Sequence, residues 1–292
     1  MNQNKGINVL SLFDGISIAQ LALQQLNIPI ANYYASEIDK NAIKVTQQHF
    51  PYTIQLGDIK QLSADKLPKI ELLVVGSPCQ DLSSLRKDRK GLDGDKSSLF
   101  FHALRLLDEV KPKYFLFENV GSMSGIDKKR LDELLGVEGI SINSNLVSAQ
   151  NRHRIYWTNI PLTIPFVKHI VLDDIISDGY VDRVKANCVL TSNVSHTKKG
   201  ILRYLTKSLG NVVYTGELFA RLSKSEKFHK IQLMPEEDVK SLFRLFTIQE
   251  LERLQTLPDG YTSLLKKTAA AHAIGNGFTL EMIKHILVSA DL

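Results

Sequence analysis

The sequence of 292 residues is 43% hydrophobic and 23% charged, the composition of a globular protein with a sizeable core. Its net charge of +5 is compatible with a polyanionic partner, although many basic proteins have none. No apolar run is long enough to cross a bilayer and no signal peptide is recognisable, so we expect an intracellular protein with no membrane anchor. Cys79 and Cys188 lie far apart and outside paired-ligand spacing, which argues against a disulfide framework and a metal site.

Short apolar or β-branched runs alternate with segments of helical spacing in the N-terminal half. Strands are expected, in chain order, at residues 7–12, 32–36, 53–56, 71–76 and 114–118. Helices are expected between them at residues 18–26, 40–49 and 97–110, the last ended by Lys-Pro. This alternation predicts a parallel α/β sheet, with ligands bound at the C-terminal ends of its strands.

The pattern changes after Ile160. Between residues 161 and 234 the apolar periodicity weakens and pieces rich in Thr, Ser, Asn and Lys appear, which predicts a smaller, loop-rich insertion. Helical spacing resumes at 235–257, and a last helix is expected at 279–289.

The expected strand at 71–76 runs into a tight loop that presents a thiol. Pro78 fixes the backbone before Cys79, and the loop at the end of a parallel strand faces a ligand crevice. These features make Cys79 a candidate nucleophile. A free cysteine is more often a small core residue, and spacing alone leaves that alternative open.

The next strand ends in a carboxylate and an amide, in Tyr114-Phe-Leu-Phe-Glu-Asn-Val120. Glu118 follows Cys79 by 39 positions (118 − 79), so the two residues belong to successive strand ends of the expected sheet. A lone glutamate at a strand end is usually only solvated. Beside a thiol in a crevice, Glu118 is a candidate acid.

Together, Gly-Ser-Pro-Cys-Gln at 76–80 and Phe-Glu-Asn-Val at 117–120 resemble the two catalytic motifs of DNA cytosine-5 methyltransferases. Further similarity lies in three segments like the family's cofactor loops, in its arginine motif, in the helix that organises its recognition domain and in its last motif: residues 12–17, 36–39, 57–59, 150–157, 244–258 and 273–279. The cofactor and arginine motifs are similar to those of vertebrate de novo and compact bacterial or phage enzymes. The last motif departs from the family, which often has Gly-Asn-Ser-Val where this sequence has Gly-Asn-Gly-Phe.

The resemblance implies an α/β, Rossmann-like fold of the S-adenosylmethionine-dependent methyltransferases, with a mostly parallel seven-stranded sheet. It also implies a catalytic, cofactor-binding domain at 1–160 and 240–292, and a small loop-rich target-recognition domain at 161–239. The implied reaction is methyl transfer from S-adenosylmethionine to carbon 5 of cytosine in duplex DNA, in a short sequence context, on a flipped-out base.

The resemblance assigns the catalytic roles. The thiolate of Cys79 adds to carbon 6 of the ring, and Glu118 protonates or hydrogen-bonds N3 as charge builds there. Arg152 and Arg154 are spaced i, i+2 on an extended segment and are expected on one face, where they hold the base and phosphate. Alone, these two arginines would indicate only an exposed basic strand.

The first cofactor loop lacks the G-x-G-x-x-G of dinucleotide sites, which suits a cofactor without phosphates. Glu37 follows Gly15 by 22 positions (37 − 15) and is expected to bind ribose hydroxyls. By resemblance Asp58 meets the adenine amino group, although either acid alone would more often cap a helix. The full expected cofactor-binding set is Phe13, Asp14, Gly15, Ile16, Ser17, Glu37, Ile38, Asp58, Ile59, Ser77, Pro78, Asn276, Gly277 and Phe278.

Double-stranded DNA is the expected partner. Residues 83–98 resemble the loop that closes over the flipped base, and Gln80 and Ser83 are expected to contact DNA. Phosphate contacts are expected from the insertion, above all from Lys198, Lys199 and Arg203, together with Lys207, Lys224, Lys227 and Lys230. A bacterial or phage enzyme would act in the cytoplasm at the nucleoid. A cognate restriction endonuclease and the oligomeric state stay open.

Two alternatives also stay open. A related branch of the family methylates transfer RNA, but the insertion lacks the Cys-Phe-Thr tripeptide associated with that branch. A catalytically silent, DNA-binding relative is the other alternative, and the intact set of Cys79, Glu118, Arg152 and Arg154 counts against it.

Overall fold

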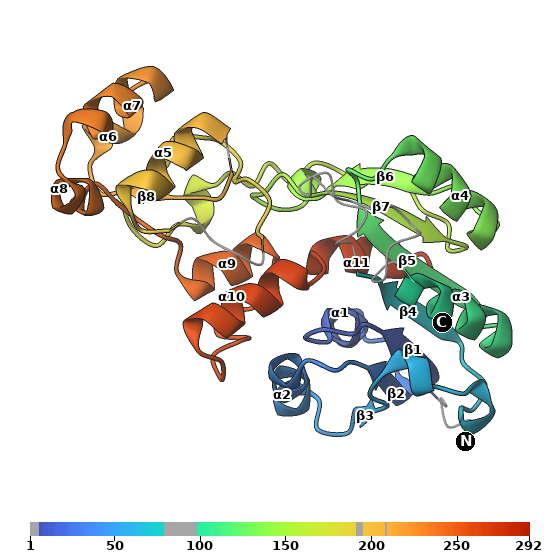
Figure 1. Ribbon diagram of the computed structural model, residues 1–292. Helices are drawn as coiled ribbons and strands as arrows, with labels where there is room; N and C mark the ends of the chain where they lie inside the picture. Colours follow the sequence, from blue (N-terminus) through green and yellow to red (C-terminus); the bar gives the residue numbers. More distant parts are fainter. Residues whose placement is uncertain (1–5, 79–97, 191–194, 208) are drawn as a thin grey trace. The chain divides into compact units, whose positions relative to one another are not determined.

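The computed structural model of the protein describes residues 6–78, 98–190, 195–207 and 209–292 (Figure 1). The chain forms two compact units. The first unit comprises Met1–Asn143, His153–Pro165 and Leu280–Leu292, and the second comprises Ser144–Arg152 and Phe166–Thr279. Within the described ranges, none of the helices combines the length and apolar character needed to span a bilayer.

The first unit is built on a seven-stranded sheet of order β3-β2-β1-β4-β5-β7-β6. Pairing is parallel from β3 to β5, whereas β7 runs antiparallel to both of its neighbours. The expected methyltransferase-type sheet is therefore confirmed. Its strands are β1 (Ile7–Leu12), β2 (Ile30–Ser36), β3 (Ile54–Gln55), β4 (Leu72–Gly76), β5 (Tyr114–Val120), β6 (Ile140–Asn143) and β7 (His153–Thr158).

The central strands are buried on both faces, which explains their near-continuous apolar sequences. Residues Leu72 to Val75 of β4 are all fully buried. One face packs against α3 (Ser98–Val110) and α4 (Gly125–Leu135) in a core that includes Phe117 and Trp157. Trp157 is the only tryptophan of the sequence, and its Nε1 donates a hydrogen bond to Asp132 Oδ1 at 2.6 Å.

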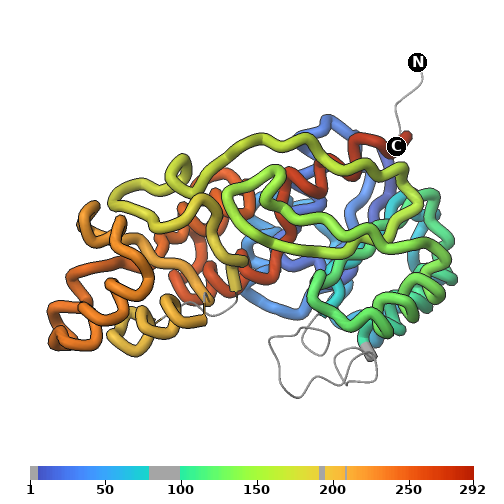
Figure 2. The backbone as a smooth tube through the Cα atoms, turned by 90° about the horizontal axis from the view of Figure 1, so that it is seen from above, coloured from blue at the N-terminus to red at the C-terminus, as the bar shows by residue number. Residues whose placement is uncertain are grey.

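The remaining helices of the first unit are α1 (Ile18–Gln25), α2 (Lys40–His49) and α11 (Leu280–Leu287), with the short 3-10 turns η1 (Ile59–Gln61) and η2 (Ala64–Lys66). The C-terminal α11 packs against α1, so the last helix of the chain belongs to the same unit as the first (Figure 2). The expected helix at 279–289 is thus found as α11, slightly shorter than expected.

The second unit is more helical than its composition suggested. It contains the two-stranded sheet β8-β9 and two apolar clusters. Its elements are η4 (Ser144–Leu146), η5 (Asp173–Ile175), α5 (Lys198–Lys207), β8 (Val213–Tyr214), α6 (Glu217–Arg221), α7 (Lys224–Leu233), α8 (Glu236–Ser241), β9 (Phe243–Arg244), α9 (Ile248–Leu254) and α10 (Lys267–Asn276).

The helical pattern expected at 235–257 is divided into α8, β9 and α9. The second of these helices begins at a capping box, in which Thr247 and Glu250 each accept a hydrogen bond from the other's backbone N–H. The compact units also divide the chain elsewhere than the expected domains do, because residues 144–152 and 240–279 belong to the second unit. The functional division into catalytic and recognition domains stays a prediction.

Candidate active site

The candidate active site begins where two parallel strands end side by side. In the β4–β5 register Gly76 lies opposite Glu118, so Ser77 and Pro78 leave β4 next to this carboxylate. Glu118 is 9% exposed and lies in β5. Cys79, the expected nucleophile, follows directly but lies outside the described residues, as do Gln80 and Ser83.

Glu118 is held by an arginine from the neighbouring antiparallel strand. Arg154 Nε lies 2.8 Å from Glu118 Oε1, and the two side chains are 12% and 11% exposed. The pair is diagonal, since Glu118 is directly opposite Tyr156 in the register and Arg154 is two residues away on the same face. A guanidinium at this distance fixes the orientation of the carboxylate at the strand end.

A residue without an expected role, Asn119, connects the two strand ends. It is 2% exposed, and its Nδ2 donates to Ser77 Oγ at 2.9 Å. Its Oδ1 accepts from the backbone N–H of Val120 at 2.7 Å, which fixes the amide orientation. Asn119 therefore holds the first residue of the segment that leads to Cys79. In the sequence, only its position directly after Glu118 in the motif could have indicated that Asn119 has a role in the site.

Arg152 has different surroundings from Arg154. It belongs to the second unit, is 2% exposed and precedes β7. Its guanidinium donates to the carbonyl oxygens of Val189 at 3.2 Å, Gly275 at 3.2 Å and Gly277 at 2.7 Å. Arg152 thus holds part of the last motif in place. The expected joint role of the two arginines at the base and phosphate stays a prediction.

The last motif closes α10. Gly277 caps this helix, and the Phe278 side chain is 7% exposed. Asn276 is exposed, and its Nδ2 lies 3.4 Å from His272 Nδ1. Asn276 and Gly277 stay candidate cofactor contacts, and Phe278 stays one although its side chain is mostly buried.

The first cofactor loop, Phe13 to Ser17, joins β1 to α1 with an unusual backbone. Phe13, Gly15 and Ser17 all have left-handed φ angles, of 58°, 60° and 56°. The loop is tied to the end of β2, because Asp14 N donates to Ser36 O at 3.2 Å. Ile16 and Ser17 are fully buried, so the main chain around Gly15 is what the loop presents.

Glu37 lies immediately after β2 and binds this loop. Its Oε2 accepts from Gly15 N at 2.8 Å, while its Oε1 accepts from Ile38 N at 2.7 Å and Asp39 N at 2.8 Å. The structure therefore brings Gly15 and Glu37 together, as the sequence predicts for neighbouring strand ends. The ribose contact itself stays a prediction.

Asp58 caps the short η1 turn, and its Oδ1 accepts from Lys60 N at 3.0 Å. The adjacent Ile59 is 3% exposed and packs in the core. Gly57, at φ +74°, has nothing within 4 Å of where a Cβ would lie. The cap is the alternative that the sequence left open for Asp58, and it does not exclude an adenine contact.

A family model described as C-5 cytosine-specific DNA methylase matches residues 7–290. The chain belongs to this family. The expectation drawn from the two catalytic motifs is confirmed at that level.

Relatives of this family member occur in phages and bacteria. Orphan methyltransferase M.SPRI of Bacillus phage SPR is 34% identical over 166 residues, which are 53% of this chain and 38% of the relative. Type II methyltransferase M.NlaX of Neisseria lactamica is 27% identical over 297 residues, which are 95% of this chain and 94% of the relative. The chain thus spans about a third to two fifths of the phage relatives' length and nearly all of this bacterial one.

Solved structures with this fold include S. pombe Dnmt2 methyltransferase, with a TM-score of 0.67 at 16% identity, covering 98% of this chain and 100% of that one. The Entamoeba histolytica methyltransferase EhMeth has a TM-score of 0.70 at 14% identity, covering 97% of each chain. At such identities the likeness concerns the fold alone, and it agrees with the sheet described above.

The family member's candidate phosphate contacts lie in the second unit and differ in accessibility. The Lys198 ammonium donates to Gln232 O at 2.9 Å and Met234 O at 2.7 Å, at the C-terminal end of α7. By contrast, Lys199, Arg203 and Lys207 are exposed and spaced four residues apart, so they share one face of α5. We call these three residues the α5 stripe.

The expectation that Lys227 contacts phosphate is wrong. Lys227 is 1% exposed, with Nζ 3.1 Å from Asp182 Oδ2 and 4.5 Å from the centre of the Tyr214 ring. Tyr204 and Tyr214 also donate hydrogen bonds to Asp182, at 2.6 and 3.0 Å. This ammonium belongs to the core of the second unit, and no local pattern indicates its partner 45 residues earlier.

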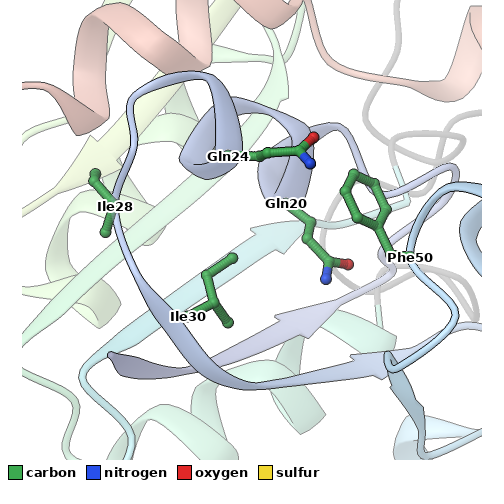
Figure 3. A pocket seen from close by; sticks show the side chains of 5 residues that line it. All are labelled: Gln20, Gln24, Ile28, Ile30 and Phe50. Carbon is green, nitrogen blue, oxygen red and sulfur yellow. The ribbon is translucent and has the colours of Figure 1, made fainter. Parts of the chain in front are cut away.

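No metal centre is found among the described residues, and a pocket that they form lies apart from the expected site. No group of three or more His, Cys, Asp or Glu side chains there is arranged to hold a metal ion. A pocket of about 200 Å³ is lined by Gln20, Gln24, Ile28, Ile30 and Phe50 (Figure 3). None of these residues belongs to the expected site, and the pocket stays without an assigned role.

Proposed function

We propose that the protein transfers a methyl group from S-adenosylmethionine to carbon 5 of cytosine in duplex DNA. The base is flipped out of the helix and is bonded covalently to Cys79 during transfer. The observation that carries the proposal is the Glu118–Arg154 ion pair beside the end of the strand that leads to Cys79. The family match across residues 7–290 supports the same activity.

Each residue has a task in this reaction. The Cys79 thiolate attacks carbon 6 of the ring, which raises electron density at carbon 5. Glu118 protonates or hydrogen-bonds N3 as charge builds there, and Arg154 holds the Glu118 carboxyl group in the orientation that this requires. Asn119 fixes Ser77 and with it the start of the segment that carries the thiol. Bound S-adenosylmethionine would supply the methyl group as an electrophile, with S-adenosylhomocysteine as the leaving group. Carbon 5 then loses its proton and the bond between carbon 6 and Cys79 breaks, which restores the aromatic ring and frees the thiolate.

The residues at the first three strand ends fit such a cofactor. A Cβ at Gly15 or at Gly57 would meet nothing within 4 Å, so there is open space beside both loops. Ile38 is 69% exposed although it is a large apolar residue, and it offers an apolar packing surface to an adenine ring. Glu37 Oε2 accepts one hydrogen bond, from Gly15 N, and has a second lone pair with which to accept one from a ribose hydroxyl. This combination of an apolar surface and a carboxylate, without a phosphate cradle, suits an adenosine-containing sulfonium compound.

The proposed DNA partner is served by the α5 stripe, whose three cations can neutralise backbone phosphates. Relatives carry names of both kinds, orphan and type II methyltransferase, so the proposal covers action with or without a cognate restriction endonuclease. An enzyme acting on bacterial or phage DNA would be found in the cytoplasm with the nucleoid.

Tritiated S-adenosylmethionine tests the proposal. We expect label in duplex DNA, none in transfer RNA, and none in DNA with Cys79→Ser, whose cofactor binding should survive. Label in transfer RNA alone would contradict the substrate, and label in neither would favour a silent relative. Bisulfite sequencing of DNA from cells that express the gene would then report the recognised sequence.

A further inference from the structure

The side chain of Asp14 is at the centre of the first cofactor loop but does not face open space. It is 6% exposed. Tyr33 on β2 donates a hydrogen bond to Asp14 Oδ1 at 2.8 Å, and Ser17 at the start of α1 donates one to Asp14 Oδ2. The carboxylate thus ties the loop to the neighbouring strand and to the helix that follows.

The loop needs such a tie because its backbone is strained. Phe13 and Ser17 are L-residues in the left-handed region, which is sterically unfavourable for both of them. The two strained residues flank the segment that contains Asp14 and Gly15. Hydrogen bonds from Ser17 N to Asp14 O and from Thr46 Oγ1 to Gly15 O close the same loop, at 3.2 and 3.4 Å.

We infer that Asp14 is a positioning residue of the cofactor site, whose carboxylate holds the main chain around Gly15 in the binding conformation through Tyr33 and Ser17. The inference rests on the proposed function, which puts the cofactor at this loop. It changes the role expected for Asp14 from direct contact to support. It also makes cofactor affinity depend on the protonation of a group that does not touch the cofactor.

Burial raises the pKa of Asp14 to about 6, and hydrogen bonds from Ser11, Ser17 and Tyr33 act in the opposite direction. Glu37 is the charged group that acts on it, and its negative charge raises the pKa further. When the carboxylate takes up a proton, the protonated oxygen becomes a donor and no longer accepts freely from the hydroxyl that was bonded to it. The loop then loses one of its ties, and affinity for the cofactor falls on the acid side of neutrality.

The test is calorimetric titration with S-adenosylhomocysteine between pH 5 and pH 8, a range in which this compound does not titrate. For the wild type we expect affinity to fall about tenfold from pH 7.5 to pH 5. In Tyr33→Phe the fall should begin at higher pH, because a hydrogen bond that lowers the Asp14 pKa is gone. In Asp14→Asn affinity should be weaker and independent of pH.

Tyr34→Phe is the matched control, since it removes a hydroxyl from the next residue of the same strand, on its opposite face. It should reproduce the wild-type profile. A wild type that does not bind the compound at pH 7.5 would overturn the cofactor proposal and this inference together. A flat wild-type profile, or an acid fall that persists in Asp14→Asn, would overturn the inference alone and leave the site intact.

Thermal unfolding of each variant shows whether it is folded at the pH of titration. If Asp14→Asn does not fold, the pH profiles of the wild type and of Tyr33→Phe still test the inference. A purely structural role would weaken binding equally at every pH, so coincident midpoints in these two proteins would contradict the inference.

Discussion

Asn119 on β5 and Ser77 after β4 are joined by a hydrogen bond of 2.9 Å, from Nδ2 to Oγ, and both residues are buried in the first unit. The bond links the strand that carries the candidate acid to the segment that leads to the candidate nucleophile. The spacing between two catalytic groups from different strands depends on such contacts, because neither strand alone determines it.

A double-mutant cycle measures this link. Asn119→Ala should lower kcat by about tenfold or more with a smaller change in KM, because a misplaced nucleophile affects the chemical step. Ser77→Ala should act in the same direction. In urea unfolding, the double variant should lose less stability than the two single variants together. The difference, which is the coupling between the two side chains, should be about 1 kcal/mol. Strictly additive losses would mean that the two side chains act independently.

Arg154→Ala should reduce methyl transfer by at least about a hundredfold, because the Glu118 carboxylate loses the cation that orients it. Arg154→Lys should recover part of the activity, since an ammonium supplies the charge without the planar guanidinium. Label incorporated into DNA under single-turnover conditions is the measurement. Lys129→Ala on the exposed side of α4 is the control and should leave transfer unchanged. Equal activity in Arg154→Ala would remove the ion pair from the mechanism.

Asp14 should also make stability depend on pH. Its pKa rises from 3.8 to about 6 on folding, so the native state binds the proton more tightly than the unfolded chain does. Stability therefore falls as pH rises through this window. Relative to Asp14→Asn, the wild type should lose on the order of 2 kcal/mol between pH 4 and pH 7, measured by urea unfolding. A difference that stays constant with pH would contradict the assignment.

The α5 stripe predicts how DNA binding responds to salt. Replacing Lys199, Arg203 and Lys207 with alanine should weaken binding and reduce the slope of log K against log salt by about one for each phosphate that is no longer neutralised. Fluorescence anisotropy on a labelled duplex at several salt concentrations provides the slope. The matched variant replaces Lys66, Lys69 and Lys129, which are exposed in the first unit. An equal effect of both triple variants would show that only net charge matters.

Local patterns in the sequence predicted much of the first unit. The apolar runs of β1 and β4 are typical of strands that are buried on both faces, and both strands lie where they were expected. The motif at the end of β5 indicated Glu118 as the candidate acid from the sequence alone. By contrast, α10 was not predicted, and β6 was found only in the structure.

Contacts between side chains far apart in the sequence could not be predicted from local patterns. The buried partners Asp182 and Lys227 are 45 residues apart, and nothing near either residue indicates the other. The capping box at Thr247 and Glu250 was readable in principle, but the helical spacing on both sides concealed the break. Asn119 was visible in its motif, yet its hydrogen bond with Ser77 depends on how two strands pair.

Trp157 gives the protein a built-in optical reporter. It is the only tryptophan in the sequence, it is 1% exposed, and it belongs to the first unit. Its emission spectrum should shift to longer wavelength only when that unit opens to water, while far-ultraviolet circular dichroism follows the helices of both units. Thermal unfolding followed by both signals would therefore show whether the two units unfold in one transition or in two.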